Sequence, residues 1–228
     1  MTDLTPENID SRHDGFALSA VRARARGQAR GGVVVIQEIF GVTPHIREMC
    51  GVFADAGYEA LAPGMFDRIE SGFLAEPNPE GFARGLAAVN ASPWNQVAGD
   101  LQAAIDALPK PCFVTGFCWG GTAAWIAAAR CAGLSGASCF YGRLIAEHLD
   151  QRPRVPVMLH YGARDANIPE ENRAKVAAAV PEAPLYIYDA GHGFCRRGGH
   201  DYDEAATALA LARTLDGFVR WGEQEEQR

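Results

Sequence analysis

The sequence lacks any apolar run near the roughly 18 residues that a membrane-spanning helix requires, so we expect no membrane partner. Its first ten residues, MTDLTPENID, are polar and acidic, without the basic start and apolar segment of a secretory signal. A cytoplasmic location is therefore expected. Low-complexity tracts, internal repeats and a dividing linker are also missing, and 228 residues of which 48% are hydrophobic suit a single domain over residues 1–228.

Cysteine pairs of the CxxC type are absent, although the chain contains six cysteines. These cysteines lie mostly in apolar stretches, which fits reduced thiols better than a disulfide framework or a zinc site. We therefore expect neither a metal ion nor another cofactor.

An excess of basic charge is missing as well, because the formal net charge is −7 at pH 7. The one basic stretch is VRARARGQAR at residues 21–30, and it has two interpretations. It is either an anion or nucleic-acid patch, or a one-sided strand and turn with Arg22, Arg24 and Arg26 pointing outward. The alternation of the arginines favours the strand. We expect no nucleic-acid partner and a monomer or small homo-oligomer.

Predicted strands and helices alternate along nearly the whole chain. The run GVVVIQ at residues 32–37 has no polar alternation, which is typical of a strand buried on both faces of a parallel sheet. Residues 43–57 predict a helix that begins after Thr43, has Pro44 in its first turn and stops at Gly57. This alternation predicts an α/β fold with a mostly parallel central sheet and helices on both faces.

The further predicted strands are residues 16–25, 58–63, 111–117, 134–142, 154–162 and 183–191. The further predicted helices are residues 95–108, 122–133, 169–180 and 201–222. Residues 63–92 are the least regular part of the sequence, and a long excursion of this kind is typical of a functional loop region.

Chemically useful side chains follow several of the predicted strands directly. Glu38 follows the first buried strand, and Cys118, Asp165 and His192 follow three later ones. Ligands of open parallel sheets bind beyond the carboxyl ends of the strands, so these groups are expected at one edge of the sheet. A thiol, a carboxylate and an imidazole occur there in the chain order of the α/β-hydrolase triad.

The segment Gly116-Phe117-Cys118-Trp119-Gly120 matches the G-x-S-x-G pattern with cysteine in place of serine. That pattern describes a nucleophile elbow, in which a tight strand-to-helix turn pushes one side chain out over the sheet. The positive end of the following helix favours a thiolate at this position. The alternative is a buried cysteine without a task, which is the usual fate of a free thiol.

The other candidate residues also have unremarkable alternatives. His192 can be a loop histidine without a role, Asp165 a turn residue, and Glu38 a charge at a strand end. Cys118, Asp165 and His192 all follow predicted strands, and they occur in the chain order of the α/β-hydrolase triad. Their occurrence together favours a catalytic triad over a separate explanation for each residue.

Four motifs make the chain, from about residue 15 to 220, resemble the dienelactone hydrolase family of α/β-hydrolases. They are QEIFG at residues 37–41, GFCWGG at 116–121, YGARD at 161–165, and AGHGF around His192. The resemblance implies an α/β-hydrolase fold without a large lid domain. It also implies that Cys118 is the nucleophile, His192 the base and Asp165 the residue that orients the base.

The resemblance implies further site residues. Glu38 matches the family glutamate that lies near the resting thiol until substrate displaces it, and the backbone N–H groups of Ile39 and Trp119 match the oxyanion hole. Members of the family bind the substrate carboxylate with two arginines, for which Arg196 and Arg84 are the candidates here. Arg196 has the alternative of a solvated loop charge.

The sequence departs from the family at LAPGMFDR, residues 61–68, where the family has an aspartate-leucine-tyrosine sequence. The chemistry of the family therefore transfers to this chain better than its substrate does. The leading hypothesis is a hydrolase that cleaves a small, carboxylate-bearing ester or lactone through an acyl-thioester intermediate. The alternatives are a non-catalytic member that binds a small molecule, and a thioesterase or acyl hydrolase of other specificity.

Overall fold

The apolar run predicted as a buried strand forms β3 (Gly32–Ile36), and every residue in it is buried. It pairs in parallel with β4 (Glu59–Pro63) on one side and with β5 (Cys112–Phe117) on the other. Helices cover both faces of such strands, which explains why β3 shows no polar alternation. The structure is a computed structural model that describes residues 3–227.

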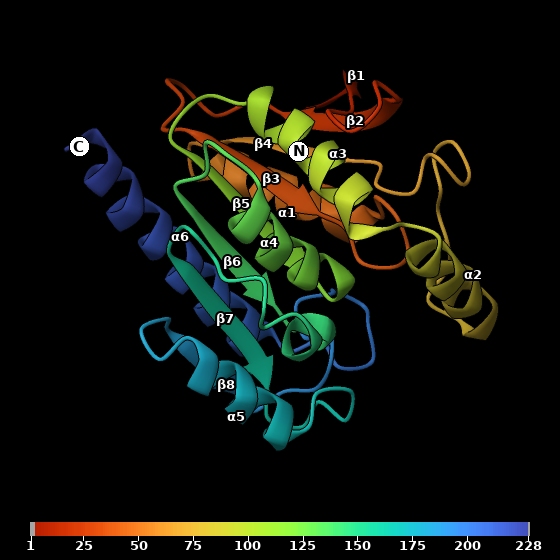
Figure 1. The fold of residues 1–228 in the computed structure, drawn as a ribbon, viewed down its shortest axis with the longest axis vertical. Coiled ribbons are helices and arrows are strands. Elements are labelled where there is room, and N and C mark those ends of the chain that lie inside the picture. Colours follow the sequence, from red (N-terminus) through yellow and green to blue (C-terminus); the bar gives the residue numbers. More distant parts are fainter. Residues whose placement is uncertain (1–2, 228) are drawn as a thin grey trace.

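One sheet of eight strands organises the fold, in the order β1-β2-β4-β3-β5-β6-β7-β8 (Figure 1). In this order the strands from β4 to β8 run parallel to one another, and β2 pairs antiparallel with both β1 and β4. The three strands on the far side of β5 are β6 (Gly136–Phe140), β7 (Val157–Gly162) and β8 (Leu185–Tyr188). The predicted α/β architecture is thus confirmed.

Helices pack on both faces of the sheet (Figure 1). The helices of the near face in Figure 1 are α3 (Trp94–Asp106) and α4 (Trp119–Arg130). Those of the opposite face are α1 (Pro44–Asp55) and α6 (Glu204–Glu226), which meet through Phe53 and Phe218. A short helix η1 (Arg143–Glu147) follows β6, and α5 (Glu170–Ala179) follows β7. No helix in the described part of the chain combines the length and the apolar character needed to cross a bilayer.

The first strand, β1 (Leu4–Asp10), was not predicted. Its sequence is polar and contains Pro6, which has no N–H to donate to a sheet. The strand nevertheless forms because it lies at the edge of the sheet, where a proline is tolerated, and pairs along its whole length with β2 (Ala17–Ala23).

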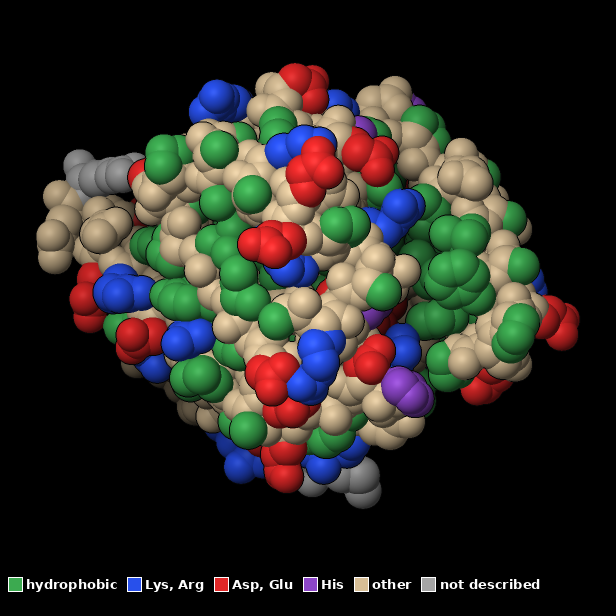
Figure 2. Space-filling model, turned by 90° about the horizontal axis from the view of Figure 1, so that it is seen from below, with side chains coloured by type: hydrophobic (Ala, Val, Ile, Leu, Met, Phe, Trp, Pro, Cys, Tyr) green, Lys and Arg blue, Asp and Glu red, His purple; other side chains and the backbone are tan. Residues whose placement is uncertain are grey.

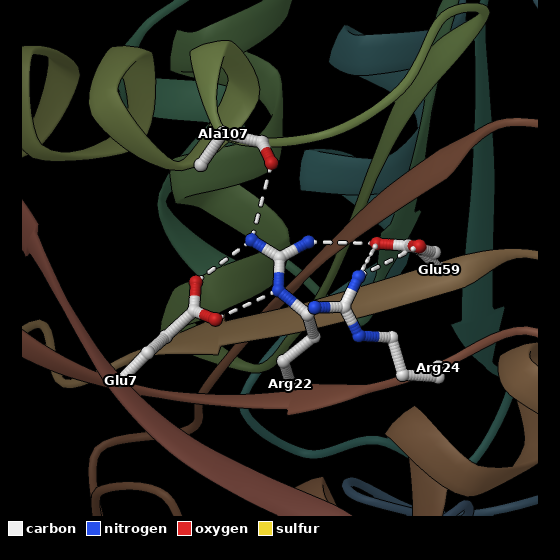
Figure 3. A network of polar contacts seen from close by, with 5 residues as sticks. All are labelled: Glu7, Arg22, Arg24, Glu59 and Ala107. Carbon is white, nitrogen blue, oxygen red and sulfur yellow. Dashed lines mark hydrogen bonds and ion pairs between the residues drawn. The ribbon is translucent and has the colours of Figure 1, made fainter.

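The prediction that Arg22 points outward was wrong, because β1 covers β2 and encloses this side chain. Arg22 is 7% exposed and donates two hydrogen bonds to Glu7, at 2.7 and 2.8 Å, and one of 2.8 Å to Glu59 (Figure 3). It also donates to the carbonyl oxygen of Ala107. The exposed Arg24 shares Glu59, so carboxylates of this chain compensate much of the basic stretch.

The irregular region between β4 and α3 contains α2 (Pro79–Asn90), which projects at the right of Figure 1. Asn78 caps this helix by accepting a hydrogen bond of 2.9 Å from the N–H of Gly81. Gly85 packs directly on the segment after β3, because a Cβ there would lie only 2.5 Å from the carbonyl oxygen of Ile39. The region thereby brings α2 over the carboxyl edge of the sheet.

Candidate active site

Cys118 occupies a sharp turn between β5 and α4. Its φ of 57° and ψ of −117° are strained for a residue with a side chain. Glycines allow the turn, because a Cβ on Gly116 would lie 2.0 Å from the carbonyl oxygen of Gly120, and one on Gly120 would lie 2.4 Å from that of Gln37. The turn therefore holds the sulfur at the amino end of α4, where the helix dipole favours negative charge.

The structure brings together the three side chains that the sequence proposed as a triad. The Nε2 atom of His192 lies 3.2 Å from the sulfur of Cys118, and its Nδ1 atom lies 2.7 Å from the Oδ2 atom of Asp165. Asp165 is 3% exposed, and its other carboxylate oxygen accepts a hydrogen bond of 2.8 Å from the N–H of Asn167. The carboxylate thus keeps the proton of the ring on Nδ1 and turns Nε2 toward the sulfur.

The charges around His192 favour its protonated form. Burial of the ring lowers its pKa, but the negative charge of Cys118 and the carboxylate of Asp165 outweigh burial and raise the pKa of His192 to about 10. An imidazolium beside the sulfur is the partner that stabilises a thiolate.

Glu38 and Arg196 form an ion pair beside the triad. The carboxylate of Glu38 is 1% exposed at its side chain and lies 3.3 Å from the Nη1 atom of Arg196. The guanidinium also lies over the ring of Phe40, 5.4 Å from its centroid. The negative charge of Glu38 is therefore compensated by Arg196 in this structure, while the sulfur of Cys118 contacts His192.

Two backbone N–H groups border the site. Trp119 is the first residue of α4, so its N–H has no acceptor within the helix. Neither this N–H nor that of Ile39 donates to a backbone carbonyl in the turns and loops of residues 3–227. Both residues line the same cavity as Cys118, so both N–H groups are free to receive an oxyanion there.

The cavity over the triad has a volume of about 540 Å³. Apolar atoms make up most of its wall, which includes Phe82, Leu86 and Val89 of α2. Seen from below in Figure 2, hydrophobic side chains gather on the right, the side on which α2 lies in Figure 1, and border a hollow. A cavity of this size suits a small organic molecule.

The structure does not place Arg84 among the residues that line the cavity, and its role in substrate binding stays a prediction. Its guanidinium donates to the carboxylate of Glu70, at 2.7 Å, and to the carbonyl oxygen of Leu74. On a helix of 3.6 residues per turn, Arg84 lies roughly 180° from the stripe formed by Phe82, Leu86 and Val89. Arg84 therefore lies on the face of α2 opposite the face that lines the cavity.

Sequence reasoning missed Arg143, Thr122 and Asn167, which all line the cavity. Arg143 lies in the segment after β6, so the strand-end rule that pointed to Cys118 also covers it. Asn167 lies two residues after Asp165, within the same turn.

Cys118 differs from the other cysteines in its access to the cavity. Of the six thiols, five are buried and only that of Cys118 is partly exposed. Burial raises the pKa of Cys50 to about 12, and it has the same effect on Cys112 and Cys131. Among residues 3–227, no three His, Cys, Asp or Glu side chains are grouped in a way that could hold a metal ion.

Comparison with known proteins gives one consistent family. The sequence profile described as "Dienelactone hydrolase family" matches residues 18–221. A carboxymethylenebutenolidase from Pseudomonas sp. strain P51 is 32% identical over 231 residues, which cover 93% of this chain and 94% of the relative. Carboxymethylenebutenolidase 1 from Cupriavidus pinatubonensis is 33% identical over 199 residues, covering 81% and 83% of the two chains.

A solved structure shows the same similarity. A Klebsiella pneumoniae protein, provisionally named a dienelactone hydrolase, superposes with a TM-score of 0.80 and 28% identity, over 95% of this chain and 99% of the other.

Proposed function

The chain belongs to the dienelactone hydrolase family and is a hydrolase of that type, and from this premise we propose that it cleaves a small, carboxylate-bearing ester or lactone with a Cys118–His192–Asp165 triad. The observation that carries the proposal is the position of His192. Its ring lies 3.2 Å from the sulfur of Cys118 and 2.7 Å from the carboxylate of Asp165. These distances support the proposed roles of nucleophile, base and orienting carboxylate.

In the first half of the proposed reaction, the proton of Cys118 already resides on His192, and the thiolate of Cys118 attacks the carbonyl carbon of the substrate. The backbone N–H groups of Ile39 and Trp119 stabilise the oxyanion that forms. The carbon–oxygen bond to the alcohol then breaks, and the imidazolium of His192 donates its proton to the leaving oxygen. The acyl group remains on the sulfur of Cys118 as a thioester.

In the second half, water attacks the thioester while His192 accepts one of its protons. The same N–H groups stabilise the second oxyanion, and the carbon–sulfur bond breaks to release the carboxylic acid. His192 keeps its proton, so the imidazolium and the thiolate are restored. Throughout, Asp165 holds the tautomer of the ring and stabilises its charged form.

The walls of the cavity and the names of the relatives support the proposed substrate class. A cavity of about 540 Å³ with mainly apolar walls admits a small molecule. The relatives are named for a butenolide lactone that bears a carboxymethylene group, which supports a carboxylate on the substrate. Arg196 lines the cavity, and its Nε atom is buried without a hydrogen-bond partner among the described residues, which supports it as a receiver for such a carboxylate.

The acyl-thioester can be tested directly by mass spectrometry. On incubation with p-nitrophenyl acetate, we expect p-nitrophenol release and an added acetyl mass on the peptide that contains Cys118. The control is Cys131→Ala, which removes a buried thiol and should acquire the same adduct. Hydrolysis with the acyl group on another residue would contradict the proposal. A Cys118 that reacts with neither the ester nor iodoacetamide would favour a binding module instead.

The pH dependence of kcat/KM should report the raised pKa of His192. The leaving oxygen needs the imidazolium, which is present below the pKa of about 10 and is lost as the pH rises through it. We therefore expect kcat/KM to decline only near pH 10. In Asp165→Asn the carboxylate that raises this pKa is gone, so the alkaline decline should move to lower pH.

The matched control for this profile is Asp189→Asn, which alters an exposed carboxylate at the end of β8 that pairs with Arg164. It should leave the alkaline decline in place. An alkaline decline that Asp165→Asn fails to move would show that His192 is not the group observed.

A further inference from the structure

A second cavity lies at the amino-terminal edge of the sheet, opposite to the edge that carries the triad. Its volume is about 590 Å³, similar to the volume of about 540 Å³ over Cys118. Its wall includes Val157, where β7 begins, Pro184, which precedes β8, and Val180, which follows α5. The arrowheads of β6 and β7 in Figure 1 point away from this amino-edge cavity, so the length of the strands separates it from the triad.

Positive charge dominates the wall of the amino-edge cavity. Arg152, Arg154 and Arg220 line it, and Glu182 is the one carboxylate among the described residues of its wall. The formal net charge of the whole chain is −7, so three arginines against one glutamate are a local excess that the composition does not explain. A concave site with an excess of positive charge raises the local concentration of anions.

Two of these guanidinium groups have no partner among the groups that the structure describes. The side chains of Arg154 and Arg220 are exposed, and neither forms an ion pair or a hydrogen bond with a described residue. Arg152 differs, because its Nη1 atom donates to the carbonyl oxygen of Ala179, at 2.8 Å, which ties it to the end of α5. The free N–H groups are therefore donors that a bound anion can use.

The backbone around the cavity is fixed without a ligand. The N–H of Arg154 donates to the carbonyl oxygen of Ala128 on α4, at 2.9 Å. Pro153 directly precedes Arg154, and Pro156 follows two residues later, so the rings of two prolines restrict this segment. Arg220 lies within the long helix α6. A site that is formed before binding loses less conformational entropy when a ligand arrives.

A tryptophan adds a flat apolar surface to the same cavity. Trp221 is next to Arg220 on α6 and is partly exposed. Its ring packs on Gly136 at the start of β6, where an added Cβ would lie 2.2 Å from the ring, and its centroid lies 6.1 Å from that of Phe218. These contacts hold the indole in place, and a fixed indole can pack against a flat ring of a ligand.

We propose that the amino-edge cavity binds a small phosphate ester that carries a flat ring, with its phosphate on Arg154 and Arg220 and its ring against Trp221. A phosphate monoester suits this wall better than a carboxylate does. It has a charge of about −1.5 to −2 at pH 7, and its three free oxygens can bind more than one guanidinium. This site does not take part in the proposed hydrolysis and does not depend on it.

Phenyl phosphate is the probe, and calorimetry measures its binding. We expect the wild-type protein to bind it, and to bind inorganic phosphate or phenol at least about 10-fold more weakly, because each supplies only one of the two contacts. Arg154→Gln and Arg220→Gln should each weaken binding about 10-fold or more, the effect of one charge-assisted hydrogen bond. The matched control is Arg24→Gln, which removes the same charge beside Glu59, and it should bind phenyl phosphate as the wild type does.

Trp221→Leu tests the place of the ring. In this variant the affinity for phenyl phosphate should fall to that for inorganic phosphate, and the affinity for inorganic phosphate itself should not change. Thermal unfolding curves show whether the packing on Gly136 survives the change. Arg154 and Arg220 are exposed, so their variants test the proposal even if Trp221→Leu does not fold.

Binding at the amino-edge cavity can be told apart from binding over the triad. Protein whose Cys118 is alkylated with iodoacetamide, and the variant Arg196→Gln, should both keep the wild-type affinity for phenyl phosphate. Loss of binding in either would place the probe over the triad and overturn the proposal. So would a double variant of Arg154→Gln and Arg220→Gln that binds phenyl phosphate normally, or a wild-type protein that does not bind it at millimolar concentration. Tighter binding of benzoate than of phenyl phosphate would overturn the choice of a phosphate.

Discussion

Cys118→Ala should lower kcat for every hydrolysed ester or lactone by about 10⁴-fold or more, the scale seen when a triad nucleophile is removed. The variant keeps the N–H groups of Ile39 and Trp119 and the base His192, so the residual rate reports what positioning and the oxyanion site achieve alone. Alanine adds no atom to the crowded turn, and the fold should be retained.

The measurement is steady-state turnover of p-nitrophenyl acetate together with a thermal unfolding curve. Cys131→Ala is the matched control, because it deletes the same thiol from a buried position away from the cavity. Full activity of Cys118→Ala with each ester would end the proposed mechanism. A parallel loss of activity in Cys131→Ala would assign the effect to folding.

The pKa of His192 should also change in Cys118→Ala. The negative charge of Cys118 is the largest of the influences that raise the pKa of His192. Without the sulfur, burial and Asp165 remain, so the pKa of the ring should fall. NMR titration of the ring in both proteins measures the difference.

The proximity of Cys118, His192 and Asp165 could be predicted, because it follows from the positions of strand ends. Cys118 directly follows β5, and Asp165 and His192 lie in the loops after β7 and β8. Parallel strands place their carboxyl ends at one edge of the sheet. Arg143 satisfies the same rule. The sequence could not show that its guanidinium forms no ion pair with the described residues, since that depends on which acidic residues other loops bring near.

The face of α2 on which Arg84 lies could be predicted from the sequence, but its ion-pair partner could not. Helical periodicity alone separates it from Phe82, Leu86 and Val89 on α2. Its pairing with Glu70 depends instead on the path of the irregular segment before the helix. No local rule fixes that path.

The ion pair of Arg22 with Glu7 could not be predicted either, because Glu7 lies in β1, a strand that its polar, proline-containing sequence disfavours. A polar segment with a proline becomes β1 only because β2 offers it a partner. Such long-range pairing decides burial, and burial decides whether an arginine is a solvated charge or an internal one.

Gly116→Ala is expected to abolish the elbow, and with it both activity and much of the stability. An added Cβ would lie 2.0 Å from the carbonyl oxygen of Gly120 and 2.3 Å from its carbonyl carbon. These are backbone atoms, so relief requires moving the start of α4 away from β5. We expect a loss of more than about 4 kcal/mol in the free energy of unfolding, the range of severe core disruption.

Gly27→Ala separates this collision from the general cost of replacing a glycine. Gly27 has a φ of +84° and nothing within 4 Å of an added Cβ, so its replacement costs only the roughly 1–2 kcal/mol of left-handed strain. Urea unfolding measures both variants, and p-nitrophenyl acetate turnover is followed on whatever folds. If Gly116→Ala unfolded at the wild-type midpoint with wild-type turnover, the close contact of β5 and α4 would be wrong. The position of the sulfur would then lose its support, because that contact is what holds Cys118 against His192.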